Sequence, residues 1–136
     1  MGPPNVLLIE DNETHARLLA QACEERHPTA AIVLARTAQD AYNVLQAGLQ
    51  PTLVILDLLL PDQNGYLILE KLRRDTRWKS LPVIIFSVED GEITRHICAT
   101  LGAVHYAIKP TTQAGFGDFI GFLAPWLGSS AAPVRE

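Results

Sequence analysis

Charged and hydroxyl side chains directly follow several short apolar runs of the sequence, and these side chains could carry out chemistry. Each run has the length and composition of a buried strand, so each polar residue would stand at a strand's carboxyl end. The residues are Glu10, Asp11, Asp57, Ser87 and Lys109. In open α/β sheets, ligands bind in the crevice outside the carboxyl ends of the strands. We therefore expect the five side chains to converge on one crevice.

Three carboxylates in such a crevice need a cation. At about 5 Å and an effective dielectric of about 20, each pair would repel by roughly 3 kcal/mol. Oxygen ligands with open water positions suit Mg²⁺, and Lys109 could pair with a carboxylate or with an incoming phosphoryl oxygen. Asp57 in particular needs a partner, because it follows a strand that is apolar throughout. The pattern thus predicts a magnesium-dependent site centred on Asp57.

Each of these residues also has a purely structural interpretation. Glu10-Asp11-Asn12 could cap the helix that follows, Ser87 could cap another, and Lys109-Pro110 could be an ordinary turn. We favour the functional interpretation because all of the residues fall at the same predicted edge.

The elements that position these residues alternate along the chain. We expect strands at 5–9, 31–35, 53–56, 82–86 and 104–108, and helices at 13–26, 38–47, 65–75, 89–101 and 113–127. Gly48 and Gly102 would end the second and fourth helices. Parallel strands require crossover helices, so the expected fold class is α/β: a (βα)5 doubly wound, flavodoxin-like sheet of five parallel strands in the order 2-1-3-4-5.

Length and composition limit the class of protein. The 136 residues suffice for one domain, which we place at 5–127 between an N-terminal tail, 1–4, and a flexible C-terminal tail, 128–136. A net charge of −4 without a basic run argues against nucleic acid as a partner, and the apolar runs are too short for a membrane span. The first residues do not resemble a signal peptide, so we expect a cytoplasmic protein.

The cysteines and histidines show no pattern of a metal or catalytic site. Cys23 and Cys98 lie far apart without a CxxC spacing, and we expect two ordinary buried thiols. The four histidines are scattered and lack an HExxH motif, so they are interpreted as surface or rim residues.

Four segments together resemble the receiver domain of two-component response regulators, over about residues 5–127. They are Leu7-Leu8-Ile9-Glu10-Asp11-Asn12, Ile55-Leu56-Asp57-Leu58-Leu59-Leu60-Pro61 with Gly65, Pro82-Val83-Ile84-Ile85-Phe86-Ser87, and Ile108-Lys109-Pro110. Each matches a family motif in order and spacing.

The resemblance implies a role for each matching residue. Asp57 would be the phosphoacceptor, and Glu10, Asp11, Asp57 and the Leu59 carbonyl would hold Mg²⁺. Ser87 would be the switch hydroxyl, Lys109 would contact the phosphoryl group, and the Lys109–Pro110 peptide bond would be cis. Tyr106 matches an aromatic residue that changes rotamer on activation.

Two positions beside the expected reaction path differ from what fast-cycling family members carry. Leu59, two residues after Asp57, cannot orient an attacking water, and Val88 is bulkier than the Ala, Gly or Ser that is common after the switch hydroxyl. Both would narrow access to phosphorus and lengthen the life of the phosphorylated state.

The resemblance also implies partners. A sensor histidine kinase would phosphorylate the protein. The protein itself would not be a dedicated enzyme, although it would assist its own phosphorylation and dephosphorylation. Only a short tail follows the expected fold, so output would be by contact through the face made by residues 89–101, 104–108 and 113–127. The same face could form a homodimer. The Glu-Asp-Asn start and Trp126 further resemble stand-alone receivers that are paired with bacterial phytochromes.

Three rival classes fit less well. A hydrolase of the haloacid-dehalogenase type would need a second aspartate at the position of Leu59. A nucleotide-binding protein would need a glycine-rich phosphate loop, and neither GxGxxG nor GxxxxGK[ST] occurs. A receiver fold kept only as a non-phosphorylated binding or dimerisation module would usually lack Asp57 or Lys109, and both are present.

Overall fold

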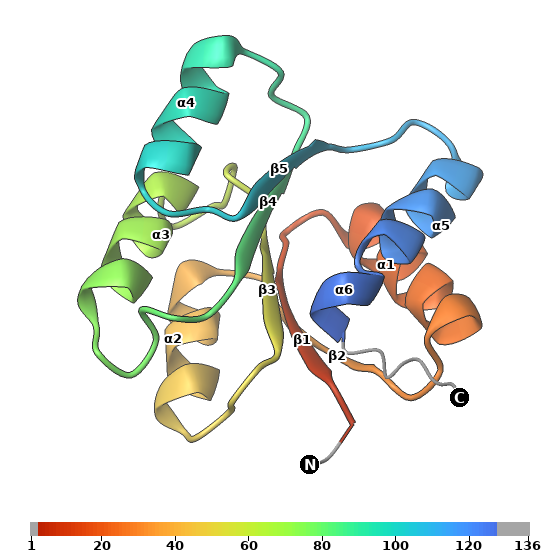
Figure 1. Ribbon diagram of the computed structural model, residues 1–136, viewed down its shortest axis with the longest axis horizontal. Coiled ribbons are helices and arrows are strands. Elements are labelled where there is room, and N and C mark those ends of the chain that lie inside the picture. Colours follow the sequence, from red (N-terminus) through yellow and green to blue (C-terminus); the bar gives the residue numbers. More distant parts are fainter. Residues whose placement is uncertain (1–2, 128–136) are drawn as a thin grey trace.

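Strands and helices alternate along the chain in the computed structural model, which describes residues 3–127 (Figure 1). The strands are β1 Asn5–Ile9, β2 Ala31–Ala35, β3 Leu53–Leu56, β4 Val83–Ser87 and β5 His105–Ile108. The helices are α1 Glu13–Arg26, α2 Ala38–Gln46, α3 Gly65–Arg74, α4 Glu92–Thr100, α5 Gln113–Phe122 and α6 Ala124–Leu127.

The strands form one parallel sheet in the order β2-β1-β3-β4-β5, which confirms the predicted fold class and strand order. Strand β1 lies between β2 and β3, with Leu8 opposite both Leu34 and Ile55. The chain runs outward from β1 to β2 and then returns past β1 to β3, so the direction of winding reverses between β1 and β3. This is the point at which doubly wound sheets open a crevice at their carboxyl edge.

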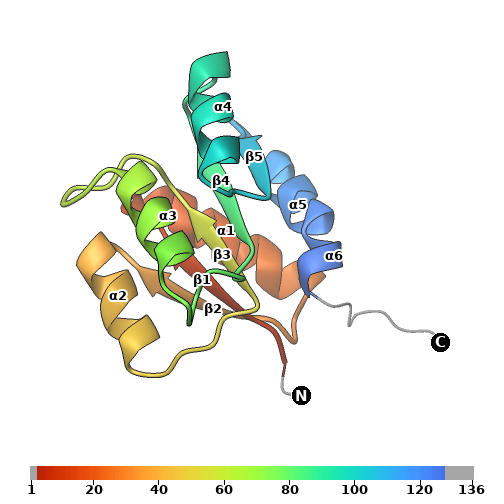
Figure 2. The same cartoon turned by 60° about the vertical axis from the view of Figure 1, so that its left-hand side comes forward.

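Helices cover both faces of the sheet, with α1, α5 and α6 on one side and α2, α3 and α4 on the other (Figures 1 and 2). Successive strand side chains point to opposite faces, so Leu7 and Ile9 pack with the second group of helices, whereas Val6 and Leu8 pack with the first. Burial on both faces explains why the strands are continuously apolar.

Short polar side chains fix the starts of four helices. Asn12, Thr37, Asn64 and Thr112 each accept a hydrogen bond from a backbone N–H in the first turn of the helix that follows. The predicted start at Thr37 is confirmed, because its hydroxyl oxygen accepts from the N–H of Asp40 at 3.0 Å.

Two helices differ from their predicted bounds by more than one residue. Helix α4 begins at Glu92 rather than at residue 89, because the Glu89 N–H donates to the Ser87 hydroxyl oxygen (3.2 Å) instead of joining a helix. The predicted helix 113–127 ends at Phe122 and restarts as α6 at Ala124. Pro125, which has no N–H to continue the first helix, occupies the second position of the short one.

Strand β2 forms one edge of the sheet and, among the described residues, pairs only with β1. Its five residues, Ala31 to Ala35, carry no charge, and the Leu34 side chain is partly exposed. Cys23 and Cys98 are buried and free, as predicted.

Some expectations concern other parts of the chain. The predicted flexible tail, 128–136, lies outside the described residues. Within residues 3–127, no helix is both long and apolar enough to cross a membrane.

Candidate functional site

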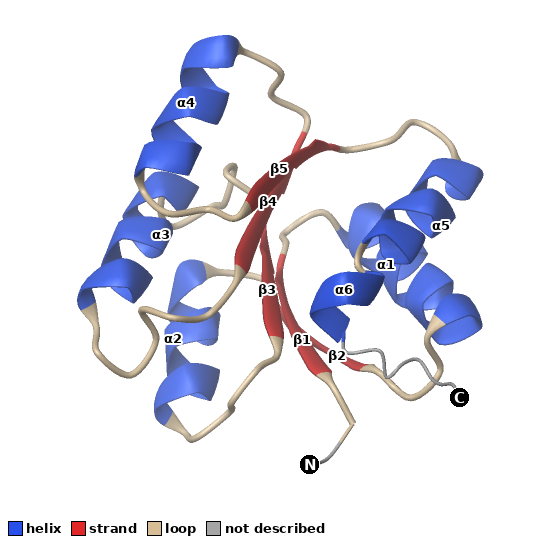
Figure 3. Ribbon diagram, in the orientation of Figure 1, coloured by secondary structure: helices blue, strands red, loops and turns tan. Residues whose placement is uncertain are grey.

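Glu10, Asp57 and Lys109 each stand directly after the last residue of a strand, where the loops leave the sheet (Figure 3). The sheet's hydrogen-bond ladder continues into these positions. The Asp57 N–H donates to the Ile9 carbonyl at 3.0 Å, and the Lys109 N–H donates to the Ser87 carbonyl at 2.8 Å. The backbone at each functional residue is thus held by the sheet rather than by a free loop.

The Lys109 ammonium joins two buried carboxylates. Its Nζ lies 2.7 Å from Glu10 Oε1 and 2.9 Å from Asp57 Oδ2. Glu10, Asp57 and Lys109 are only 1%, 6% and 7% exposed, so water screens these contacts little. A buried lysine whose charge is shared by two carboxylates leaves the group one negative charge in excess when all three are ionised.

The surroundings of Glu10 raise its pKa from 4.5 to about 7. Burial is the largest cause of the rise, the hydrogen bond and charge of Asp57 add to it, and Lys109 opposes both. Glu10 is therefore partly protonated near neutral pH. A cation beside the two carboxylates would favour the ionised form.

The loop after β3 shapes the space beside Asp57. The Leu59 N–H donates to Asp57 Oδ1 at 3.2 Å, and the Gly65 N–H donates to the Leu58 carbonyl at 3.0 Å. A side chain on Gly65 would place its Cβ 2.7 Å from Leu58 Cα, closer than such atoms approach. Only glycine allows α3 to begin this close to the loop, which keeps residues 57–65 compact.

His15 also lies at the site, a role that sequence reasoning did not assign to it. Its ring Nδ1 lies 3.0 Å from Lys109 Nζ. The ring is half-buried, and its centroid is 6.0 Å from that of Phe116 on α5. The position of His15 in the sequence could have indicated this role. His15 lies in the first turn of α1, directly after the acidic loop that follows β1, and is therefore close to the carboxyl edge of the sheet.

The predicted role of Asp11 as a metal ligand stays a prediction. Its side chain is exposed, and within residues 3–127 no group of three His, Cys, Asp or Glu side chains is arranged to hold a metal ion. The donor types nevertheless suit Mg²⁺, because Glu10 and Asp57 supply carboxylate oxygens and Asp11 adds a third carboxylate on the same loop. Lys109 offsets one of the two negative charges of the buried pair, and a bound cation would offset the other.

Ser87 and Tyr106 are connected through the backbone of Glu89. The Ser87 hydroxyl oxygen accepts from the Glu89 N–H at 3.2 Å, and the Tyr106 hydroxyl donates to the Glu89 carbonyl at 2.8 Å. Ser87 is fully buried at the end of β4, whereas Tyr106 lies within β5, opposite Ile85. A movement of the Ser87 hydroxyl would therefore reach Tyr106 through the loop between β4 and α4.

One expectation needs correction. No peptide bond among residues 3–127 is cis, so the cis bond predicted before Pro110 is wrong. The trans form is the more stable one by about 0.5–1 kcal/mol, and Lys109 reaches both carboxylates from it. Tyr106 is 9% exposed and thus buried, and its change of rotamer on activation stays a prediction.

The positions predicted to control access lie at the rim. The side chains of Leu59 and Val88 are 57% and 56% exposed, and they belong to the loops after β3 and β4. Their effect on access to Asp57 stays a prediction.

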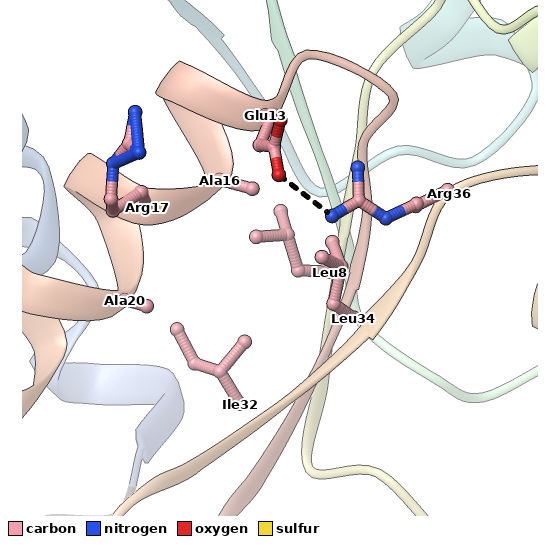
Figure 4. Close-up of a pocket in the computed structure, with 8 residues that line it drawn as sticks. All are labelled: Leu8, Glu13, Ala16, Arg17, Ala20, Ile32, Leu34 and Arg36. Atoms are coloured by element: carbon pink, nitrogen blue, oxygen red, sulfur yellow. Dashed lines mark ion pairs between the residues drawn. The ribbon is translucent and has the colours of Figure 1, made fainter.

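A separate hollow of about 290 Å³ lies between α1 and β2 (Figure 4). Ala16, Ala20, Ile32 and Leu34 form its apolar wall, and Glu13 pairs with Arg36 at 3.5 Å beside it. Glu10, Asp57 and Lys109 do not line this hollow.

Comparison with known sequences gives a consistent set of relatives. Residues 6–118 match the response regulator receiver domain family. Response regulator Rre1 of Synechocystis sp. is 40% identical over 87 residues, which cover 64% of this chain but only 37% of that protein. The probable methanogenesis regulatory protein FilR2 of Methanothrix harundinacea is 29% identical over 136 residues, covering 94% of this chain and 86% of that protein.

Solved structures share the fold. The Mn²⁺-bound form of response regulator Rcp1 has a TM-score of 0.85 at 22% identity, covering 96% of this chain and 99% of that one. The phosphorylated cyanobacterial phytochrome response regulator RcpA has a TM-score of 0.87 at 24% identity, covering 97% and 99% of the two chains. At these identities the likeness establishes the architecture alone.

Proposed function

The chain belongs to the response regulator receiver family, and from that premise we propose that Asp57 accepts a phosphoryl group from a sensor histidine kinase in a Mg²⁺-dependent reaction. The observation that carries the proposal is the position of the Asp57 carboxylate. It lies at the carboxyl end of the central strand β3, 2.9 Å from the Lys109 ammonium. A nucleophile and a cation for the transferred group are thus side by side.

The proposed step is a transfer between two side chains. A carboxylate oxygen of Asp57 forms a bond to phosphorus, the bond between phosphorus and the kinase histidine breaks, and the histidine keeps the electron pair. Lys109, which already donates to Asp57, donates to a phosphoryl oxygen of the product. Glu10, Asp11, Asp57 and the Leu59 carbonyl would hold Mg²⁺, which would supply positive charge to offset the charge on the phosphoryl oxygens.

The signal would leave the site through the connection between Ser87, Glu89 and Tyr106. If the Ser87 hydroxyl moved toward a phosphoryl oxygen, its hydrogen bond with the Glu89 N–H would break. The Tyr106 hydroxyl donates to the carbonyl of the same Glu89, so a shift of this residue would also move Tyr106. Glu89 precedes α4, so the face made by α4, β5 and α5 would change. We assign partner binding, and dimerisation where it occurs, to this face.

The kinase is proposed to be a photoreceptor of the bacterial phytochrome type. Two proteins of similar structure are described as the cyanobacterial phytochrome response regulator RcpA and as a response regulator in red light signaling of R. palustris. The latter has a TM-score of 0.83 at 20% identity and covers 97% of this chain.

Intact mass spectrometry tests the phosphoacceptor directly. Incubation with Mg²⁺ and phosphoramidate, or with a phytochrome kinase and ATP, should add one phosphoryl group to the wild type and none to Asp57→Asn. Asp40→Asn, which changes an exposed aspartate in the first turn of α2, serves as the matched control and should be modified like the wild type. A wild type that gains no phosphoryl group from any donor would favour a receiver fold kept as a binding module.

A further inference from the structure

His15 is held against the phosphoacceptor site from two directions. Its backbone N–H donates to the side-chain oxygen of Asn12 at 2.9 Å, which fixes the first turn of α1. Its ring lies between Lys109, with Nδ1 and Nζ 3.0 Å apart, and the ring of Phe116, tilted by 33° to it. The imidazole is therefore placed by its surroundings rather than free in solvent.

The hydrogen bonds of Lys109 determine the state of this imidazole. An ammonium has three N–H donors and no acceptor. Nζ has three partners within hydrogen-bond distance, namely Glu10 Oε1 at 2.7 Å, Asp57 Oδ2 at 2.9 Å and His15 Nδ1 at 3.0 Å. Nδ1 must then accept, so the ring is neutral and its proton is on Nε2. Burial and the positive charge of Lys109 both lower the pKa of His15, while Asp57 opposes them.

We infer that His15 is a positioning residue for Lys109, whose neutral imidazole holds the ammonium over Asp57 while the phosphoryl group is transferred. The inference rests on the proposed function. Two of the three acceptors change during that reaction, because Asp57 becomes the acyl phosphate and Glu10 belongs to the proposed magnesium set. The imidazole takes no part in either change, so it alone keeps Lys109 on the side of α1 throughout.

Without this acceptor, one N–H of Lys109 would turn toward water, and the ammonium would point at the incoming phosphoryl oxygen for a smaller fraction of the time. The half-exposed ring can be replaced by water, so the fold would be little affected. We expect the phosphorylation rate to fall by about threefold to tenfold, the size of effect that one net hydrogen bond supplies.

The first test compares rates with phosphoramidate and Mg²⁺, a small donor that needs no kinase docking. His15→Leu removes the acceptor and keeps an apolar side chain, His15→Gln keeps an oxygen acceptor, and His96→Leu makes the same change at an exposed histidine of α4. We expect the rate to fall only in His15→Leu, with His15→Gln within about twofold of the wild type. Equal rates in wild type and His15→Leu would overturn the inference.

The second test reads the ring itself and needs no phosphorylation. Long-range ¹H–¹⁵N NMR of the wild type at neutral pH should show His15 protonated on Nε2 alone, and Lys109→Met should change the tautomer population. A ring protonated on Nδ1 would overturn the inference. A wild type that takes up no phosphoryl group would instead overturn the proposed function and the rate effect together with it, so the two failures are distinguishable.

Discussion

Replacing Asp57 by asparagine should change the pH dependence of stability as well as abolish phosphorylation. In wild type the pKa of Glu10 is raised from 4.5 to about 7, mainly by burial and next by Asp57. A folded-state pKa above the unfolded value means that Glu10 favours the folded protein fully below about pH 4.5, and this contribution is lost as the pH rises through 7. The wild type should therefore be less stable at pH 8.5 than at pH 6.

The size of the effect follows from the pKa of Glu10. A rise from 4.5 to about 7 corresponds to about 3 kcal/mol of unfolding free energy. Most of this change occurs between pH 4.5 and pH 6, so the whole shift of Glu10 makes the wild type only about 1 kcal/mol less stable at pH 8.5 than at pH 6. Burial is the largest cause of the shift and stays in the variant, whereas the contribution of Asp57 is removed. The amide introduced by Asp57→Asn has no charge to repel ionised Glu10, so between pH 6 and pH 8.5 the variant should lose less stability than the wild type, by up to about 1 kcal/mol. For a chain of 136 residues, 1 kcal/mol corresponds to a difference of about 3–4 °C in Tm.

Thermal unfolding followed by circular dichroism in EDTA at pH 6 and pH 8.5 measures this difference. Asp40→Asn, which removes a charge from the exposed surface of α2, should follow the wild type at both pH values. An Asp57→Asn variant whose Tm differs from wild type by the same amount at both pH values would refute the reasoning. It would show that Asp57 does not contribute to the raised pKa of Glu10.

Three further changes test other parts of the site. Lys109→Met should lower the unfolding free energy by about 3–5 kcal/mol at pH 8, because two buried carboxylates lose their cation; a chemical denaturation series with a loss below about 1 kcal/mol would contradict this. Leu59→Asn with Val88→Ala should speed autodephosphorylation by about tenfold to a hundredfold by opening the rim and orienting water, and an unchanged decay would show that access there does not set the lifetime. Tyr106→Phe removes the bond to the Glu89 carbonyl, so beryllofluoride should shift α4 amides less than in wild type; equal shifts would place the coupling elsewhere.

The sequence was sufficient for the fold because its strongest signals are local. Continuous apolar runs such as Leu53 to Leu56 indicate strands buried on both faces, and the helices between them require parallel pairing. The same logic placed Asp57 and Lys109 at one edge, and their side chains do meet.

The remaining features depend on contacts that no local pattern encodes. His15 meets Lys109 across 94 positions of the chain, and a helical histidine has no periodicity that would reveal this partner. The start of α4 was misplaced because the Glu89 N–H bonds to Ser87, a local alternative to the helix.

The edge strand β2 has a consequence for the behaviour of the protein in concentrated solution. Natural edge strands are commonly protected by lysines, prolines or bulges, because their free backbone groups can template a strand from another molecule. Ala31 to Ala35 contain no lysine or proline, and the nearest charge is Arg36 at the strand's end. Self-association by backbone pairing would begin at this edge, on the opposite side of the sheet from β5. Turbidity or fibre growth would thus increase with protein concentration without any change at Asp57.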